Sequence, residues 1–87
     1  MMMESVKFSN SSRLVEASYE STSGQGENET GNLYVTFKDK SYSRYKYSGV
    51  PRIDWVRLAI TEKTGDSAGK VFERYIKGGE YPYIKLQ

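Results

Sequence analysis

The sequence contains neither cysteine nor histidine in its 87 residues, and these absences exclude several kinds of chemistry. Without cysteine there is no disulfide, no thiolate nucleophile and no cysteine-liganded zinc site. Without histidine, the side chain best suited to proton transfer and metal binding near neutral pH is missing. The acidic residues are scattered, and their spacing implies no catalytic pair. We therefore predict that the protein is not an enzyme and has no catalytic residue, metal ligand or cofactor.

Long apolar runs are also missing. No stretch approaches the roughly 18 apolar residues that a membrane span needs. Residues 1–10 contain no apolar run of the kind found in signal peptides. We therefore expect a cytoplasmic protein without membrane association. A chain of this length buries a modest core, and with no disulfide to support that core we expect marginal stability.

The sequence is rich in tyrosine, with 8 Tyr against 3 Phe and 1 Trp. Tyrosine combines a large flat apolar ring with a polar tip, which suits half-exposed surfaces and binding sites. The alternative is that a small sheet uses tyrosine simply as a strand former. The formal net charge of +2 is too small to imply a nucleic-acid partner by itself.

The chain divides into a leader and one domain. We expect residues 1–10 to be a flexible leader and residues 11–87 to form a single domain. Within that domain residues 21–31 contain no apolar side chain, which predicts a long polar hairpin insert.

Hydrophobic periodicity predicts an α+β fold. Alternating apolar residues indicate strands, and apolar residues at helical spacing follow them. The natural packing is a three-stranded antiparallel meander with two helices packed on one face and a short extended C-terminal tail. The expected elements are strands over 13–20, 32–38 and 41–48 and helices over 51–63 and 67–77.

The pairing of the second and third strands can be predicted from what each register would bury. A three-residue loop at 39–41 places Val35 opposite Tyr45 on the buried face. A two-residue loop would instead bury Arg44 and Lys46 on that face. Burying unpaired cations costs far more than a turn preference, so we predict the three-residue loop.

Several short segments follow one another along the chain in a definite order and spacing. They are Leu33-x-Val35-x-Phe37, Tyr45-Lys46-Tyr47, Ser48-Gly49-Val50-Pro51, Ser67-Ala68-Gly69-Lys70 with Phe72, then Ile76, and Tyr81-Pro82-Tyr83. In this order they resemble the KTSC domain, a short module named for its occurrence at the C-terminus of some lysyl-tRNA synthetases. The resemblance covers roughly residues 11–86 and implies RNA binding. The chain departs from the family pattern in its polar insert and at Ala68, where a basic residue is common.

The predicted register sorts side chains onto two faces of the sheet. The residues expected to face the helices are Leu33, Val35, Phe37, Tyr45 and Tyr47. The residues expected on the opposite face are Tyr34, Thr36, Lys38, Tyr42, Arg44 and Lys46. Bases stack on exposed rings for about 1–3 kcal/mol each, and cations meet phosphates, so this face suits single-stranded nucleic acid. The alternative is an ordinary solvated face on which Glu16 and Glu20 pair with the cations.

A basic stripe is predicted on the second helix. Lys70, Arg74 and Lys77 are four and three residues apart, so they share one face of an α-helix. Such a stripe suits phosphate or an acidic protein surface. The alternative is a solvated helix face that Glu73 partly balances.

The segment 65–70 superficially resembles a phosphate-binding loop. Only three residues separate its glycines, and Val71 stands where the motif requires serine or threonine. We interpret this segment as a helix cap formed by Ser67, although the N-terminus of a helix also attracts anions.

These patterns predict a small non-catalytic module that binds RNA or single-stranded nucleic acid. Bases would stack on two tyrosines of the sheet face while its cations and the basic stripe bind phosphate. The alternative is a protein-interaction module that regulates or inhibits a cellular or host protein. The predicted nucleic-acid-binding residues are Tyr34, Lys38, Tyr42, Arg44, Lys46, Lys70, Arg74 and Lys77.

Overall fold

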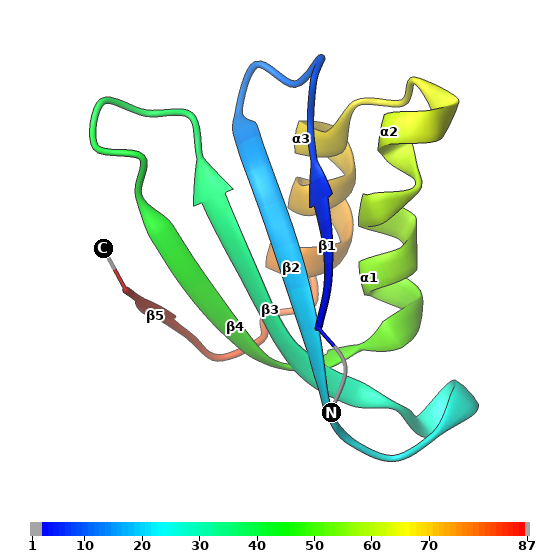
Figure 1. Ribbon diagram of the computed structural model, residues 1–87. Coiled ribbons are helices and arrows are strands. Elements are labelled where there is room, and N and C mark those ends of the chain that lie inside the picture. The colour runs from blue at the N-terminus through cyan, green and yellow to red at the C-terminus, as the bar shows by residue number, and fades with distance from the viewer. Residues whose placement is uncertain (1–2, 87) are drawn as a thin grey trace.

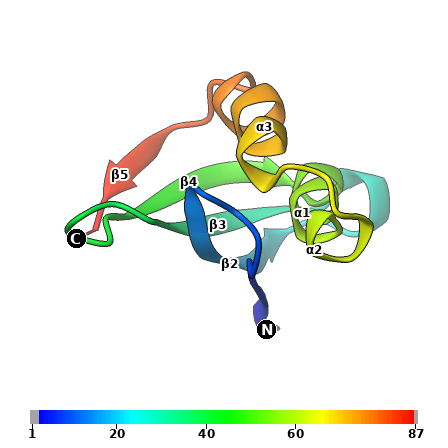
Figure 2. The same cartoon turned by 90° about the horizontal axis from the view of Figure 1, so that it is seen from above.

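An antiparallel sheet of five strands frames the protein, and each strand pairs with its neighbours in the sequence. Helices cover one face of this sheet and leave the other open (Figures 1 and 2). The computed structural model describes residues 3–86. The α+β class is confirmed, whereas the expected count of three strands is wrong because one more strand lies at each edge. The strands are β1 (Met3–Lys7), β2 (Leu14–Ser23), β3 (Thr30–Phe37), β4 (Arg44–Pro51) and β5 (Tyr83–Lys85).

The edge strands β1 and β5 correct two expectations. β1 lies in the segment 1–10 that we expected to be a flexible leader, of which residues 1–2 lie outside the described part. Val6 of β1 lies opposite Ala17, and Phe8 beyond it is only 6% exposed. Burying these apolar side chains favours a paired strand over a free leader. At the other edge, β5 pairs with β4 where we expected an extended tail.

Part of the polar segment 21–31 belongs to the sheet. β2 and β3 continue into it, and only residues 24–29 connect them, with a 3-10 turn, η1, at Gly26–Asn28. The carbonyl of Glu29 then accepts a hydrogen bond of 3.0 Å from the amide of Arg52. The connection is therefore fixed to the start of the first helix, contrary to the long hairpin insert we expected.

The pairing of β3 with β4 confirms the predicted register. Val35 lies opposite Tyr45, and Leu33 lies opposite Tyr47. Leu33 and Val35 are fully buried and Tyr47 is 6% exposed, so these side chains face the helices. The cations of β4 remain on the open face, as the burial argument requires.

The loop between β3 and β4 is longer than predicted, because β4 begins only at Arg44. Tyr42 has a φ of +50°, which lies outside the strand region of backbone conformation. The Asp39 carboxylate closes the loop by accepting hydrogen bonds from the amides of Ser41 and Ser43 at 3.0 and 2.9 Å. These bonds lower the pKa of Asp39, those from Ser43 most strongly.

The helical part follows β4 directly. Gly65, at a φ of +85°, ends its first half. The hydroxyl of Ser67 accepts a hydrogen bond of 3.2 Å from the amide of Lys70 and caps the second half. The Ser67 cap agrees with the sequence analysis. No helix within residues 3–86 is long and apolar enough to cross a membrane. The helices are α1 (Arg52–Ala59), α2 (Thr61–Thr64), α3 (Ala68–Val71) and the π-helical η2 (Phe72–Lys77).

The core lies between the sheet and these helices. Trp55 of α1 stacks on Tyr19 of β2, with 5.7 Å between ring centroids and 8° between ring planes, and Leu58 is fully buried. This orientation of α1 leaves Val56 and Ile60 39% and 48% exposed.

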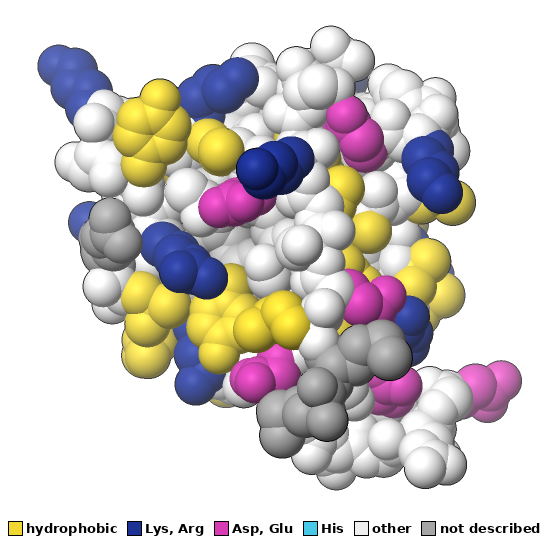
Figure 3. Space-filling view, in the orientation of Figure 1, with side chains coloured by type: hydrophobic (Ala, Val, Ile, Leu, Met, Phe, Trp, Pro, Cys, Tyr) yellow, Lys and Arg dark blue, Asp and Glu magenta, His cyan; other side chains and the backbone are white. Residues whose placement is uncertain are grey.

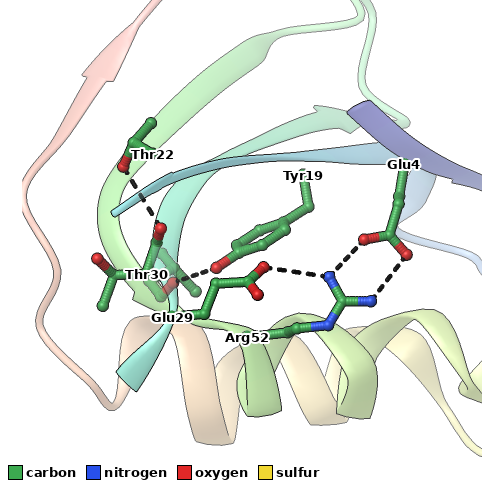
Figure 4. A network of polar contacts seen from close by, with 7 residues as sticks. Glu4, Tyr19, Thr22, Glu29, Thr30 and Arg52 are labelled. Atoms are coloured by element: carbon green, nitrogen blue, oxygen red, sulfur yellow. Dashed lines mark hydrogen bonds and ion pairs between the residues drawn. The ribbon is translucent and has the colours of Figure 1, made fainter. Parts of the chain in front are cut away.

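An ion-pair network ties β1 and the connection after β2 to α1 (Figure 4). The guanidinium of Arg52 donates to both carboxylate oxygens of Glu4 at 2.5 and 3.0 Å and to Glu29 at 3.3 Å. The hydrogen bonds from Arg52 lower the pKa of Glu4. Beside them the Tyr19 hydroxyl donates to the carbonyl of Val50 at 2.9 Å.

Arg52→Ala is expected to lower the free energy of unfolding by about 1–2 kcal/mol at neutral pH, a modest value because the network is partly exposed to solvent. Since the pKa of Glu4 is lower in the folded state than its ordinary 4.5, this stabilisation is present above that value and lost as pH falls through the folded pKa. Urea denaturation at a series of pH values should show the difference from wild type shrinking in acid. A difference that persists unchanged to about pH 3 would contradict the role of Glu4.

Candidate functional site

The open face of the sheet brings three predicted site residues together. Tyr34 of β3 lies opposite Lys46 of β4, and the Arg44 guanidinium lies 5.4 Å from the centroid of the Tyr34 ring. The Tyr34 hydroxyl donates to Glu20 at 3.4 Å. Burial, and then the Glu20 carboxylate, raise the pKa of Tyr34. This ring is already engaged, so a base would have to displace the guanidinium or stack on it.

Acidic residues from β2 interrupt this basic face. Glu16 and Glu20 share it, and Lys7 of β1 lies directly opposite Glu16. In Figure 3, which shows this side of the molecule, acidic and basic side chains alternate without forming a continuous basic track. The face therefore also fits the alternative that the sequence left open, a solvated surface with paired charges.

Two further predicted residues belong to the β3–β4 loop and its border. Tyr42 is 56% exposed and lies in the loop, outside β4. The ammonium group of Lys38 donates to the carbonyl of Ser11 at 2.9 Å. Lys38 also lines a groove on the helix-covered side of the sheet, so it is not confined to the open face where we expected it.

The three cations of the predicted helix stripe contact different neighbours. The Arg74 guanidinium lies 5.4 Å from the centroid of the Tyr75 ring, whereas the Lys77 ammonium lies 3.8 Å from Glu73 and lines the same groove as Lys38. Lys70 is exposed on α3. Because η2 is a π-helix with more residues per turn, the spacing rule for an α-helix does not align the three side chains.

The groove has a volume of about 510 Å³ and lies among β4, the β3–β4 loop, η2 and the C-terminal segment. This volume is within the range of about 300–1,000 Å³ that is typical of small-molecule sites. We call it the aromatic groove after the aromatic residues that line it, Phe37, Tyr45, Tyr47, Phe72, Tyr81 and Tyr83. The charged residues that line it are Arg13, Lys38, Asp39, Lys77 and Glu80.

The aromatic groove exists because β5 extends past the part of the sheet that the helices cover (Figure 2). Tyr83 of β5 lies opposite Tyr47 and is 63% exposed. The centroid of its ring lies 5.5 Å from that of Tyr47 and 5.9 Å from that of Tyr45. Phe72 packs edge-on against Tyr47, with 5.6 Å between centroids. A continuous set of rings thus runs from the buried core to the solvent.

A buried carboxylate fixes the C-terminal wall of the aromatic groove. Asp54 of α1 is 7% exposed and accepts a hydrogen bond of 2.7 Å from the Tyr81 hydroxyl. The Arg57 guanidinium donates to the same carboxylate at 2.9 Å. Burial, and then the bond to Asp54, raise the pKa of Tyr81 to about 12. The segment that leads from η2 to β5 is therefore held against α1.

The cations around the aromatic groove differ in how strongly they are neutralised. Glu73 pairs with Arg13 at 2.6 Å and with Lys77 at 3.8 Å. The hydrogen bond from Arg13 lowers the pKa of Glu73, so this carboxylate is ionised at neutral pH. Lys38, by contrast, bonds to a neutral backbone carbonyl of Ser11. It is the cation best placed to accept an anionic group.

Sequence reasoning assigned the aromatic groove residues to other roles. Tyr45 and Tyr47 were expected in the core, and Tyr81 and Tyr83 in a tail. Tyr45 and Tyr47 are two residues apart, and so are Tyr81 and Tyr83. This spacing could have indicated that each pair shares a face, since residues two apart in a strand lie on one face. Whether the two pairs lie together depends on the pairing of β4 with β5, which was not predicted from the sequence.

Sheet, helices and groove define a small α+β domain in which residues 3–86 include no group of three or more acidic side chains placed to hold a metal ion. The family model of the KTSC domain matches residues 10–81, and the chain belongs to this family. Comparison with the curated proteins and with the solved structures gives no match. β1 and β5 lie outside the matched residues.

Proposed function

We propose that the protein is a non-catalytic module that binds single-stranded nucleic acid, RNA in preference to duplex, at the aromatic groove. The observation that carries this proposal is the convergence of six aromatic side chains and three cations on one groove of about 510 Å³. Each ring that accepts a base contributes about 1–3 kcal/mol. Unstacked bases of single strands are what proteins read in RNA, and cations at the rim attract the phosphates.

The residues predicted on the open sheet face and on the second helix take a secondary role in this proposal. Arg44, Lys46, Lys70 and Arg74 raise the local positive potential and so increase the rate of encounter with a polyanion. Lys38 and Lys77 contact the strand directly, because both line the aromatic groove.

The absence of catalysis is also part of the proposal. The acids that line the aromatic groove are Asp39 and Glu80. Asp39 is engaged by the amides of its own loop, and its lowered pKa makes it a weak base. The Tyr81 hydroxyl does bond to a carboxylate, that of Asp54, but Arg57 engages this carboxylate as well, and the raised pKa of Tyr81 opposes ionisation of the hydroxyl.

Two matched double variants test where the strand binds. Lys38→Ala/Lys77→Ala removes two charges from the aromatic groove, and Arg44→Ala/Lys46→Ala removes two from the open face. In titrations with labelled single-stranded RNA, single-stranded DNA and duplex DNA, we expect only the first variant to weaken single-strand binding. It should also reduce the slope of log affinity against log salt by at least about 0.7, which is the contribution of one phosphate contact.

Other results of that titration would contradict the proposal. Equal weakening by both double variants would indicate that the nucleic acid binds across the whole basic surface and not at the aromatic groove. Weakening by Arg44→Ala/Lys46→Ala alone would move it to the open sheet face. The wild type binding no nucleic acid even at low salt would remove the proposed function altogether.

A protein-interaction module is the second candidate function, and one observation favours it. Ile53, Val56 and Ile60 of the first helical segment are 56%, 39% and 48% exposed. Their spacing places them along one side of the helix, as in helices that dock into apolar grooves of partner proteins. Val56→Asp would abolish such docking and leave nucleic-acid affinity unchanged, so this variant distinguishes the two functions.

A further inference from the structure

The hydroxyl of Tyr47 is an unused hydrogen-bond donor at the bottom of the aromatic groove. Tyr47 is only 6% exposed, and buried tyrosine hydroxyls usually find a partner. Those of Tyr19, Tyr34 and Tyr81 bond to Val50, Glu20 and Asp54. Within residues 3–86 the Tyr47 hydroxyl has no such partner.

This hydroxyl faces the space of the aromatic groove. Tyr47 lines the groove, and no fully enclosed side-chain nitrogen or oxygen atom among the described residues lacks a hydrogen bond. The unpaired hydroxyl is therefore not sealed in the core. Burial raises the pKa of Tyr47 to about 12, so the group keeps its proton at neutral pH and remains a donor.

One exposed ring beside this donor can accept a flat ligand. Tyr83 is the exposed ring, and its centroid lies 5.5 Å from that of Tyr47 at an interplanar angle of 37°. A planar group that stacks on Tyr83 from the side of the aromatic groove would bring its edge toward the Tyr47 hydroxyl. A volume of about 510 Å³ suits a single nucleotide and excludes a duplex.

The charges around the aromatic groove favour a single phosphate over a chain of phosphates. Three cations and two carboxylates line it, which leaves a net charge of +1. Arg13 and Lys77 also share the Glu73 carboxylate, whereas Lys38 has only a carbonyl partner. One phosphate beside Lys38 is compatible with this balance, and Asp39 and Glu80 would repel further phosphates.

We propose that the aromatic groove is a site for one nucleotide unit, whose base stacks on Tyr83 and accepts a hydrogen bond from the Tyr47 hydroxyl while Lys38 binds its phosphate. The inference rests on the proposed function, because it names the part of a strand that the protein recognises. The same chemistry is presented by a free nucleoside monophosphate and by an unstacked nucleotide of a strand. The inferred site does not include contacts that a nucleic-acid strand makes outside the aromatic groove.

Calorimetric titration with the four ribonucleoside 5′-monophosphates and with a single-stranded RNA tests this site. Tyr47→Phe removes only the hydroxyl and should weaken the preferred monophosphate roughly 3- to 10-fold. Tyr83→Ala removes the exposed ring and should weaken all four by roughly tenfold. Tyr34→Phe, which removes a hydroxyl from the open face, is the matched control and should change nothing. Circular dichroism confirms that each variant is folded.

The outcomes separate this inference from the proposed function. Binding of monophosphates and RNA that both Tyr47→Phe and Tyr83→Ala weaken supports both. RNA binding that neither variant alters overturns the nucleotide site and leaves the proposed function standing. Binding of a monophosphate without binding of RNA supports the site and contradicts the proposed function. Absence of binding to either ligand overturns both.

Discussion

Phe72→Ala is expected to lower the free energy of unfolding by about 3–5 kcal/mol. Phe72 is 1% exposed and makes edge-on ring contacts with Phe37 at 5.3 Å and with Tyr47 at 5.6 Å between centroids. It connects the helical layer with β3 and β4 and forms part of the aromatic groove. Removing its ring leaves a cavity that a short π-helical segment cannot close by simple movement.

This loss is large relative to the total free energy of unfolding of a domain of this size. Small domains are stable by about 5–15 kcal/mol in total, so the variant should lose a large fraction of its stability. Urea denaturation followed by circular dichroism measures the change. Ile53→Ala, at a side chain that is 56% exposed, is the control and should stay within about 0.5 kcal/mol of wild type. A loss below about 1 kcal/mol for Phe72→Ala would contradict the assignment of this ring to the core.

The register of the β3–β4 hairpin was predictable from the sequence, because the other register would bury unpaired cations. Only one alignment of β3 with β4 keeps Arg44 and Lys46 out of the core, and the structure pairs Val35 with Tyr45 in that alignment. The caps at Gly65 and Ser67 were predictable for a similar reason, because each satisfies a local backbone requirement. Local constraints of this kind are contained in the sequence.

The edge strands were not predictable in the same way. β1 has one half-buried valine, Val6, and its other apolar residue, Met3, is exposed. All three residues of β5 are exposed. Neither has the alternation that indicates a strand. Their pairing depends on neighbours distant in the sequence, including the bond from Tyr81 to Asp54 that holds the C-terminal segment in place.

The aromatic groove is a consequence of one of those edge strands, β5. Tyr47 is a core residue, as predicted, and at the same time lines the aromatic groove, because Tyr83 approaches it from β5. The sequence analysis treated core and binding surface as alternatives for each tyrosine. In this fold Tyr47 belongs to both, since it is buried in the core and also lines the aromatic groove.

Alkaline pH is expected to unfold the protein between about pH 10 and pH 12. Burial raises the pKa of Tyr19 and of Tyr47 from 10.0 to about 12. Each such difference corresponds to roughly 3 kcal/mol of folding free energy, so the two together are comparable with the whole stability of a small domain. Because the folded-state pKa is the higher one, this stabilisation is complete below about pH 10 and is lost as pH rises through about 12. Tyr81, with a pKa of about 12, acts in the same direction.

Parallel titrations by circular dichroism and by the ultraviolet absorbance of tyrosinate measure this transition. The loss of secondary structure should coincide with a cooperative rise in tyrosinate, because the Tyr19 hydroxyl, which is bonded to the Val50 carbonyl in the core, ionises only as the core opens. Tyr19→Phe should destabilise the protein modestly at neutral pH, since the carbonyl of Val50 loses its donor. The fall in its stability between about pH 10 and pH 12 should nevertheless be smaller than in wild type, because one raised pKa has been removed. Full ionisation of all tyrosines with the secondary structure intact would show that these hydroxyls are open to water, and the packing of Tyr19 against Trp55 could then not be tight.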